Sequence, residues 1–279
     1  MTDSVHIRPL LRDEITLAID WAATEGWNPG LADAVAFGAM DGEGFWVAEV
    51  EGVPAATISV VNYDAHFAFL GFYIARPEMR GRGIGWKLWQ AGLAHAGDRT
   101  VGLDGVLAQQ ANYASQGFQF AYRNIRFAGR TGTGTSDGTV DLRDVPFEAI
   151  EASDATIFPA PRAAFLKAWL GTASHVGRAV LREGRLAGWG VVRPARHGWK
   201  IGPLVAEDAA AAEAVYGALN MAAGQGDTVL DVPEPNAAAQ ELARRHGLAP
   251  VFETARMYTG PVRPVEIAKL YGVTSFELG

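Results

Sequence analysis

The chain has 279 residues, which exceeds a typical single domain of about 100–200 residues, so two domains are expected. Hydrophobic residues make up 49% and charged residues 20% of the chain, a composition that excludes a disordered protein. A net charge of −7 argues against a basic surface for nucleic acid, and the absence of cysteine excludes disulfides, thiolate metal sites and a cysteine nucleophile.

The first 26 residues carry acidic side chains where a signal peptide would need an apolar core, and no apolar stretch reaches about 18 residues. A cytoplasmic protein without membrane contact is therefore expected. The histidines do not occur in pairs at metal-ligand helical spacing, so no metal site is expected either. The sequence leaves the oligomeric state open, a homodimer included.

The N-terminal region predicts two helices, because apolar residues recur at helical spacing between 10 and 40 and an Asn-Pro-Gly break at 28–30 interrupts them. Three apolar runs follow, at 45–50, 55–61 and 67–75, and a Glu-Gly turn separates the first two. Short runs joined by tight turns predict an antiparallel meander.

A glycine-rich turn at 80–85 leads into a predicted helix over 86–95. A strand over 101–106, a helix over 108–115 and a strand over 118–128 are expected next. Residues 131–141 begin with a run of Gly, Thr and Ser that is typical of a flexible connector, so they are expected to link a first domain, 1–130, to a second, 142–279.

The second half repeats the pattern of the first at an offset of about 130 residues. Glu51-Gly52 corresponds to Glu183-Gly184, Gly71 to Gly202, and Leu103-Asp104 to Leu230-Asp231. The fold expected is therefore α+β, with two similar domains, each a mixed, mainly antiparallel twisted sheet flanked by helices.

The segment Arg80-Gly81-Arg82-Gly83-Ile84-Gly85 joins the end of a strand to the start of a helix. Glycine lets the backbone approach an anion closely, and amides at a helix N-terminus add their dipoles, so this turn can hold a pyrophosphate. The spacing fits neither a Walker loop nor a dinucleotide-binding turn.

The turn resembles the signature of the GNAT acyltransferase superfamily, Gln or Arg followed by x-x-Gly-x-Gly or Ala, with Arg80, Gly83 and Gly85 in the defining positions. This resemblance implies acetyl-coenzyme A as co-substrate and direct transfer of the acetyl group to an amine, here a primary amine of a small molecule. The cofactor contacts it implies lie on the preceding strand, the glycine turn and the helix beyond: Phe72, Tyr73, Ile74, Arg80, Gly81, Arg82, Gly83, Ile84, Gly85 and Asn112.

A second family motif places a tyrosine four residues before a Gly-Phe pair, and Tyr113 stands four residues before Gly117-Phe118. By the resemblance, Tyr113 protonates the departing thiolate. Many relatives also carry a glutamate on the strand before the glycine turn, and this chain has none there. Asp104 is the replacement expected first as general base, with Glu25 and Asp64 behind it.

The loop between the first two helices commonly roofs the acceptor pocket in this family. Here it carries Glu25, Trp27 and Asn28, which can offer a charge, a flat ring and an amide to an amine. The alternative interpretation is a protein that binds or senses acyl-coenzyme A without catalysis, which would have no use for Tyr113.

The second half lacks the arginine and the glycine-rich turn at the matching position, where Glu207 and Asp208 precede a run of alanines. Acidic side chains at a helix start repel a pyrophosphate. The second domain is therefore expected to be a degenerate GNAT-like unit that shapes the acceptor site.

Overall fold

The computed structural model describes residues 4–130 and 134–279. Its α-helices are α1 (Ile15–Thr24), α2 (Asp33–Phe37), α3 (Ile84–Ala96), α4 (Gln110–Ser115), α5 (Phe147–Ile157), α6 (Ala163–Gly171), α7 (Ala209–Ala223) and α8 (Ala237–Arg245). Its strands are β1 (Val5–Pro9), β2 (Phe45–Val50), β3 (Val53–Asn62), β4 (Phe67–Ala75), β5 (Thr100–Val106), β6 (Gln119–Arg130), β7 (Val140–Asp141), β8 (Val176–Arg182), β9 (Arg185–Pro194), β10 (Trp199–Ala206), β11 (Asp227–Pro233), β12 (Ala249–Tyr258) and β13 (Leu270–Gly272).

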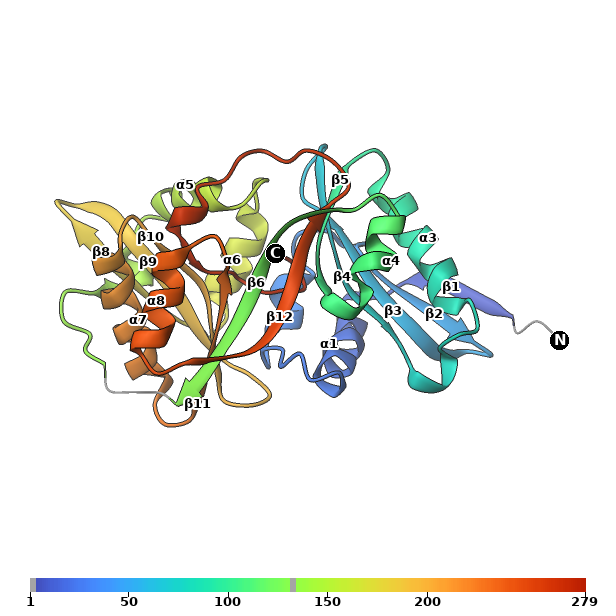
Figure 1. Ribbon diagram of the computed structural model, residues 1–279, viewed down its shortest axis with the longest axis horizontal. Coiled ribbons are helices and arrows are strands. Elements are labelled where there is room, and N and C mark those ends of the chain that lie inside the picture. Colours follow the sequence, from blue (N-terminus) through green and yellow to red (C-terminus); the bar gives the residue numbers. More distant parts are fainter. Residues whose placement is uncertain (1–3, 131–133) are drawn as a thin grey trace.

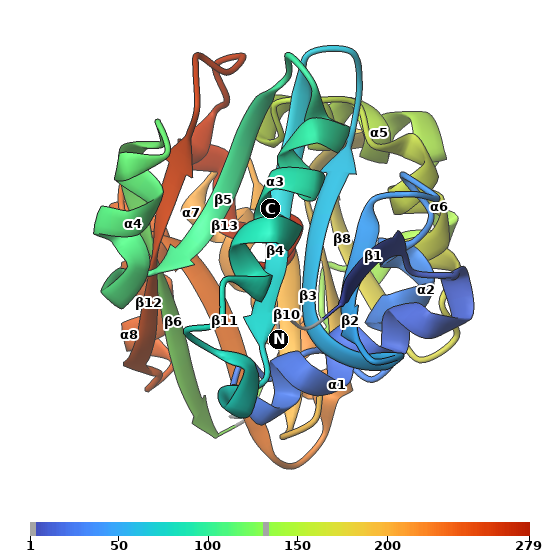
Figure 2. The same ribbon diagram turned by 90° about the vertical axis from the view of Figure 1, so that its right-hand side faces the viewer.

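The described strands form one continuous, mainly antiparallel sheet in the order β1-β2-β3-β4-β5-β12-β6-β11-β10-β9-β8-β7. Two similar α+β halves lie side by side along the long axis, with α3 and α4 on one half and α7 and α8 on the other (Figures 1 and 2). The expected fold class and the elements expected between residues 10 and 128 are confirmed, while β1 was not anticipated.

The two halves exchange a strand at the centre of the sheet. β12, from the second half, pairs antiparallel with β5, and β6, from the first half, pairs antiparallel with β11. β12 and β6 also pair with each other, and the two strands lie together at the centre of the molecule (Figure 1). Each half therefore closes the sheet of the other, whereas the sequence predicted two domains, each with a sheet of its own.

In the first half, β4 and β5 are parallel neighbours only as far as Leu70 and Leu103. Beyond that point β4 bends, because Phe72 has a positive φ of 47° and the register with β3 shifts between Thr57 and Ser59. The Thr57 hydroxyl donates a 3.0 Å hydrogen bond to the carbonyl oxygen of Phe72 and so stabilises the bend. The two strands separate there and leave an opening between them.

In the second half, β10 and β11 are parallel over Trp199–Ile201 and also separate. The opening is filled by the chain itself. β13 pairs antiparallel with β10 at Leu204 and Val205, and the Val273 amide donates a 2.8 Å hydrogen bond to the carbonyl oxygen of Asp231 on β11. This half therefore has no open gap between its two central parallel strands.

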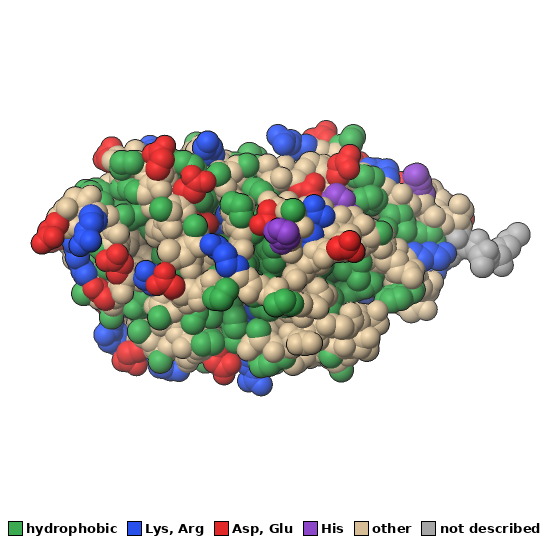
Figure 3. Space-filling model, turned by 90° about the horizontal axis from the view of Figure 1, so that it is seen from above, with side chains coloured by type: hydrophobic (Ala, Val, Ile, Leu, Met, Phe, Trp, Pro, Cys, Tyr) green, Lys and Arg blue, Asp and Glu red, His purple; other side chains and the backbone are tan. Residues whose placement is uncertain are grey.

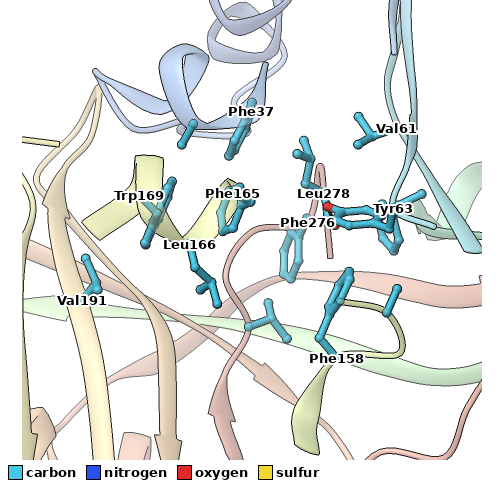
Figure 4. Close-up of a cluster of buried hydrophobic side chains, with 14 of the residues drawn as sticks. Phe37, Val61, Tyr63, Phe158, Phe165, Leu166, Trp169, Val191, Phe276 and Leu278 are labelled. Atoms are coloured by element: carbon cyan, nitrogen blue, oxygen red, sulfur yellow. Dashed lines mark hydrogen bonds between the residues drawn. The ribbon is translucent and has the colours of Figure 1, made fainter. Parts of the chain in front are cut away.

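After β13 the chain runs as a buried C-terminal segment, residues 273–279, between the two halves. The Tyr63 hydroxyl donates a 2.8 Å hydrogen bond to the carbonyl oxygen of Leu278, and Arg162 donates one to Gly279. Figure 4 shows aromatic side chains of both halves around this segment: Phe37 and Tyr63 from the first, Phe158 and Phe165 from the second. The segment is thus part of one shared hydrophobic core.

Residues 131–133 of the expected linker lie outside the described residues, and its last two residues form β7. On the face in Figure 3 acidic and basic side chains are interspersed, with no extended basic patch. Within residues 4–130 and 134–279, no helix has the length and apolar character to cross a membrane, and no cluster of three or more metal-ligating side chains occurs.

Candidate functional site

A cavity of about 510 Å³ opens where β4 and β5 separate. Its walls come from both strands, the glycine-rich turn, the loop after α1, and the second half of the chain. Its lining residues are Glu25, Trp27, Leu70, Gly71, Phe72, Tyr73, Ile74, Ala75, Met79, Arg80, Gly81, Gly83, Gly85, Trp86, Leu103, Asp104, Gly105, Val106, Gln109, Tyr113, Phe252, Thr254, Phe276 and Glu277.

The glycine-rich turn forms one end of the cavity. Gly81 and Gly83 have φ of 74° and 76°, and a Cβ at either position would meet no other atom, so the turn is open on its outer side. Gly83 precedes α3, and no acidic side chain occupies the first turn of that helix. The amides at this helix start, with their dipoles, can hold a phosphate group.

Most of the residues expected to contact the cofactor line the cavity, but Arg82, Ile84 and Asn112 do not. Arg82 Nη1 contacts the Met79 sulfur at 3.0 Å, Ile84 is buried in the core, and the Asn112 side chain bonds Gln109 on the exposed side of α4. Arg80 lines the cavity, where it forms a 2.6 Å ion pair with Glu25.

Tyr113 lines the cavity between the glycine turn and β5. Its ring stacks on Trp89 of α3 with centroids 5.8 Å apart, and a side chain at Gly105 would overlap it. Burial, with a smaller contribution from Tyr73, raises the pKa of Tyr113 to about 12. The phenol therefore keeps its proton at neutral pH, which a general acid requires.

Asp104 also lines the cavity, but both of its carboxylate oxygens are already engaged. Arg256 of β12 donates to Oδ1 at 2.8 Å and to Oδ2 at 2.6 Å, and Asn124 Nδ2 donates to Oδ1 at 2.8 Å. A proton arriving at Asp104 would have to displace one of these bonds. Asp64, the third candidate base, accepts bonds from the amides of its own turn, His66 and Phe67, and does not line the cavity.

The loop after α1 contributes Glu25 and Trp27 to the cavity wall, with Glu25 beside Arg80 of the glycine-rich turn, whereas Asn28 does not line the cavity. Asn28 instead joins the halves: its Nδ2 donates to the carbonyl oxygen of His197 at 3.0 Å, and its Oδ1 accepts from the His197 amide at 2.8 Å. The loop expected to roof the acceptor pocket is therefore held by the second half.

Sequence analysis missed the four lining residues of the second half, Phe252 and Thr254 on β12 and Phe276 and Glu277 in the C-terminal segment. Phe252 and Thr254 reach the cavity because β12 is exchanged between the halves. Phe276 and Glu277 reach it because the chain continues from β13, which fills the opening of the second half. The available signal was that Glu277 is the only charged residue in the stretch 270–279, since a lone charge in an otherwise uncharged stretch suggests a buried charge.

The corresponding site of the second half cannot offer free amides to a phosphate. Asp208 caps α7 by accepting a 2.9 Å hydrogen bond from the Ala211 amide, and it also forms an ion pair with Arg182. With β13 already between β10 and β11, this half presents a capped helix and a filled gap where the first half presents a cavity.

Comparisons with known proteins agree with this architecture. A family model described as "Acetyltransferase (GNAT) family" matches residues 12–119, and one described as "Acetyltransferase (GNAT) domain" matches residues 150–272. The holothin acyltransferase of Pseudoalteromonas sp. (strain SANK 73390) is 31% identical over 275 residues, which cover 98% of this chain and 94% of that protein.

Solved structures show the same fold. A protein of Pyrococcus horikoshii described as an acetyltransferase superposes with a TM-score of 0.83 at 22% identity, covering 99% of this chain and 96% of that one. A tandem GNAT protein from the clavulanic acid biosynthesis pathway gives 0.63 at 16% identity, covering 92% and 99%. The chain therefore belongs to the GNAT family of acyltransferases, as a member with two GNAT domains.

Proposed function

We propose that the protein transfers an acetyl group from acetyl-coenzyme A to a primary amine of a small molecule. The observation that carries the proposal is that one cavity is lined by the open glycine turn at the start of α3, by Tyr113 and by aromatic side chains of both halves. The relative named holothin acyltransferase supports acyl transfer as the reaction.

Each group in the cavity has a chemical part in this reaction. The amides at the start of α3, with Arg80, would hold the pyrophosphate, and this requires Arg80 to exchange Glu25 for the phosphate. Backbone amides of Tyr73 and Ile74, which line the cavity where β4 has left β5, would stabilise the oxyanion. Tyr113 would give its proton to the departing thiolate.

In this proposal the second half is a degenerate unit that shapes the acceptor end. Its own gap is filled by β13, and it supplies Phe252, Thr254, Phe276 and Glu277 to the cavity. The domain division at residues 131–141 stays part of the proposal, with the qualification that β6 and β12 are exchanged between the halves.

Titration calorimetry of acetyl-coenzyme A into wild type and Gly83→Ala tests the cofactor site. Gly52→Ala is a matched control, because Gly52 has nearly the same φ, 78°, also has open space beside it, and lies in the turn between β2 and β3. We expect binding in wild type and Gly52→Ala and a loss of at least about tenfold in Gly83→Ala. Absence of binding by wild type would refute the proposed function.

A protein that binds acetyl-coenzyme A without catalysis would also pass that test. Thiol release from acetyl-coenzyme A in the presence of primary amines separates the two functions. Release that depends on both the amine and Tyr113 supports the enzyme, and binding without release from any amine supports the alternative.

A further inference from the structure

The carboxylate of Glu277 is buried at the wall of the cavity without a hydrogen-bond partner. Glu277 is 3% exposed, and neither Oε1 nor Oε2 has a partner among the described residues. Its backbone contacts Gly71, since a Cβ at Gly71 would overlap the Glu277 carbonyl oxygen. Gly71 directly follows Leu70, the last residue of β4 paired with β5, so Glu277 lies where the cavity begins.

The other buried carboxylates of the described residues all have an arginine partner. Asp33, Asp154 and Asp231 each form an ion pair of 2.7–2.9 Å with an arginine. Leaving a buried charge without a hydrogen bond is costly, so an unpartnered carboxylate persists only where something compensates it. A ligand that enters the cavity can supply the missing donor.

Two cations lie near Glu277 without forming a hydrogen bond to it. Arg126 and Lys200 both interact with it electrostatically, and the Phe276 ring lies 4.8 Å from Arg126 Cζ and 5.9 Å from Lys200 Nζ. The Arg126 guanidinium donates its hydrogen bonds to Asp231 and to the carbonyl oxygen of Trp27. Arg126 and Lys200 thus offset the negative charge of Glu277 without hydrogen-bonding to it, and both carboxylate oxygens can still accept hydrogen bonds.

We infer that Glu277 binds the acceptor ammonium, directly or through one water, and takes its proton before the attack. This rests on the proposed function. Two other carboxylates line the cavity: Asp104 is held on both oxygens by Arg256, and Glu25 forms an ion pair with Arg80. No carboxylate stands on β4, so the C-terminal segment supplies to the first half the base that its own strand lacks.

The proton balance is complete without a further reactant. R–NH₃⁺ gives one proton to the Glu277 carboxylate, and the neutral nitrogen attacks the thioester carbonyl. The C–S bond breaks as the N–C bond becomes an amide, and the thiolate takes the Tyr113 proton. The phenolate recovers a proton from the amide nitrogen, and Glu277 releases its own to water when the products leave.

The surroundings of Glu277 indicate the class of acceptor. Trp27, Phe252 and Phe276 also line the cavity, and Phe252 and Phe276 lie with ring centroids 6.3 Å apart. Thr254 Oγ1 on this wall is also buried without a partner. The acceptor we infer is a primary ammonium on a compact apolar body, such as a benzylamine, with one further polar group in reach of Thr254.

Glu277→Gln tests the inference, because it removes the charge and keeps the shape. Benzylamine is titrated calorimetrically into coenzyme A-saturated protein, and kcat/KM is measured with acetyl-coenzyme A and either benzylamine, an ammonium at neutral pH, or phenylhydrazine, which is uncharged there. We expect Glu277→Gln to bind benzylamine at least about tenfold more weakly and to lose about 10²-fold in kcat/KM for it. The loss with phenylhydrazine should be below about tenfold, since that amine needs no deprotonation.

Glu266→Gln is the matched control in the same C-terminal region, since Glu266 forms a half-exposed ion pair with Lys269. Glu266→Gln should leave kcat/KM unchanged with both amines. Glu277→Gln should also unfold close to the wild-type temperature, because the carboxylate makes no hydrogen bond that the change could break, whereas a structural residue would lose stability and activity together.

The outcomes are distinguishable from failure of the proposed function. Wild type that binds no acetyl-coenzyme A refutes that function. Wild type that binds acetyl-coenzyme A but neither amine overturns the acceptor class. Glu277→Gln that retains wild-type affinity and rate, or loses equally with both amines, overturns the role of Glu277; Glu277→Asp, which restores the charge, should recover part of the rate.

Discussion

Arg126 Nη1 donates a 2.7 Å hydrogen bond to the carbonyl oxygen of Trp27, and thereby ties the loop over the cavity to the sheet shared by the two halves. The other nitrogens of Arg126 donate to both oxygens of Asp231 on β11, at 2.7 and 2.8 Å. Burial acts to raise the pKa of Asp231, but the charges of Arg126 and Lys200 outweigh it and hold the pKa below its ordinary value. A residue of the second half thus fixes the cation that positions the loop after α1.

Asp231→Asn should destabilise the protein by about 3–5 kcal/mol, because it leaves Arg126 as an uncompensated buried charge. It should also raise KM for the acceptor while the affinity for acetyl-coenzyme A stays within about twofold. Urea unfolding and steady-state kinetics check both parts. Glu253→Gln is the control, since Glu253 forms an exposed 3.5 Å pair with Arg123 and should cost about 1 kcal/mol or less. Equal losses in the free energy of unfolding in Asp231→Asn and Glu253→Gln would contradict the role given to Asp231.

The sequence predicted the first-half elements and the glycine turn because each depends on a local pattern: apolar periodicity, a glycine pair and a helix start. The strand exchange could not be predicted in this way. β6 and β12 have similar patterns and each can close either sheet, so only the packing of the whole chain decides the partner.

The candidate base shows the same limit. Asp104 stands next to Gly105 in a strand whose position was predicted correctly, yet Arg256, 152 residues later, pairs with it. Glu277 lies 206 residues beyond Gly71, and only tertiary structure brings them together. Residues that approach through long-range pairing leave no spacing in the sequence by which to recognise them.

Tyr113→Phe should lower kcat by about 10²-fold or more without changing the affinity for acetyl-coenzyme A, because the phenol acts only when the thiolate leaves. The rate of thiol release measures kcat, and calorimetry measures the affinity for acetyl-coenzyme A. Tyr73→Phe is the matched comparison: the hydroxyl of Tyr73 also lies by the start of α3, next to Gly85, and burial raises its pKa too. A larger kcat loss in Tyr73→Phe would transfer the acid role to that residue.

His175 should make the protein sensitive to mild acid. Burial, with Arg193 as a smaller cause, lowers the pKa of His175 to about 4, while its unfolded value is 6.5. As pH falls below 6.5 the unfolded chain gains a proton that the folded protein does not accept, so stability present above 6.5 is lost down to about pH 4, by up to about 3 kcal/mol. Unfolding by urea at pH 7 and pH 4.5 measures this difference.

His175→Gln should reduce the pH dependence, because glutamine does not titrate and can still donate to the carbonyl oxygen of Trp169, which the His175 ring nitrogen contacts at 2.9 Å. Exposed His197→Gln is the control and should leave the slope between pH 4.5 and 7 unchanged. An unaltered slope in His175→Gln would show that other groups cause the acid sensitivity.

Gly202→Ala should act on the cavity from a distance through the C-terminal segment. A Cβ at Gly202 would overlap the carbonyl oxygen of Val273 and approach that of Thr274 within 2.8 Å, so the start of the segment must shift. Overpacking of this kind costs about 1–3 kcal/mol, and any displacement carried along the buried chain moves Glu277 relative to Gly71. We expect a lower kcat/KM for the acceptor together with unchanged affinity for acetyl-coenzyme A, because the overlap lies at Val273 and Thr274 and not at the glycine turn. Gly188→Ala, where a Cβ would come no closer than 3.3 Å to its neighbours in the adjacent strand and helix, serves as the control for alanine in the second half. If Gly202→Ala lost stability but kept its full rate with the acceptor, the C-terminal segment would be a filler of the second-half gap and not a support for the catalytic end of the cavity.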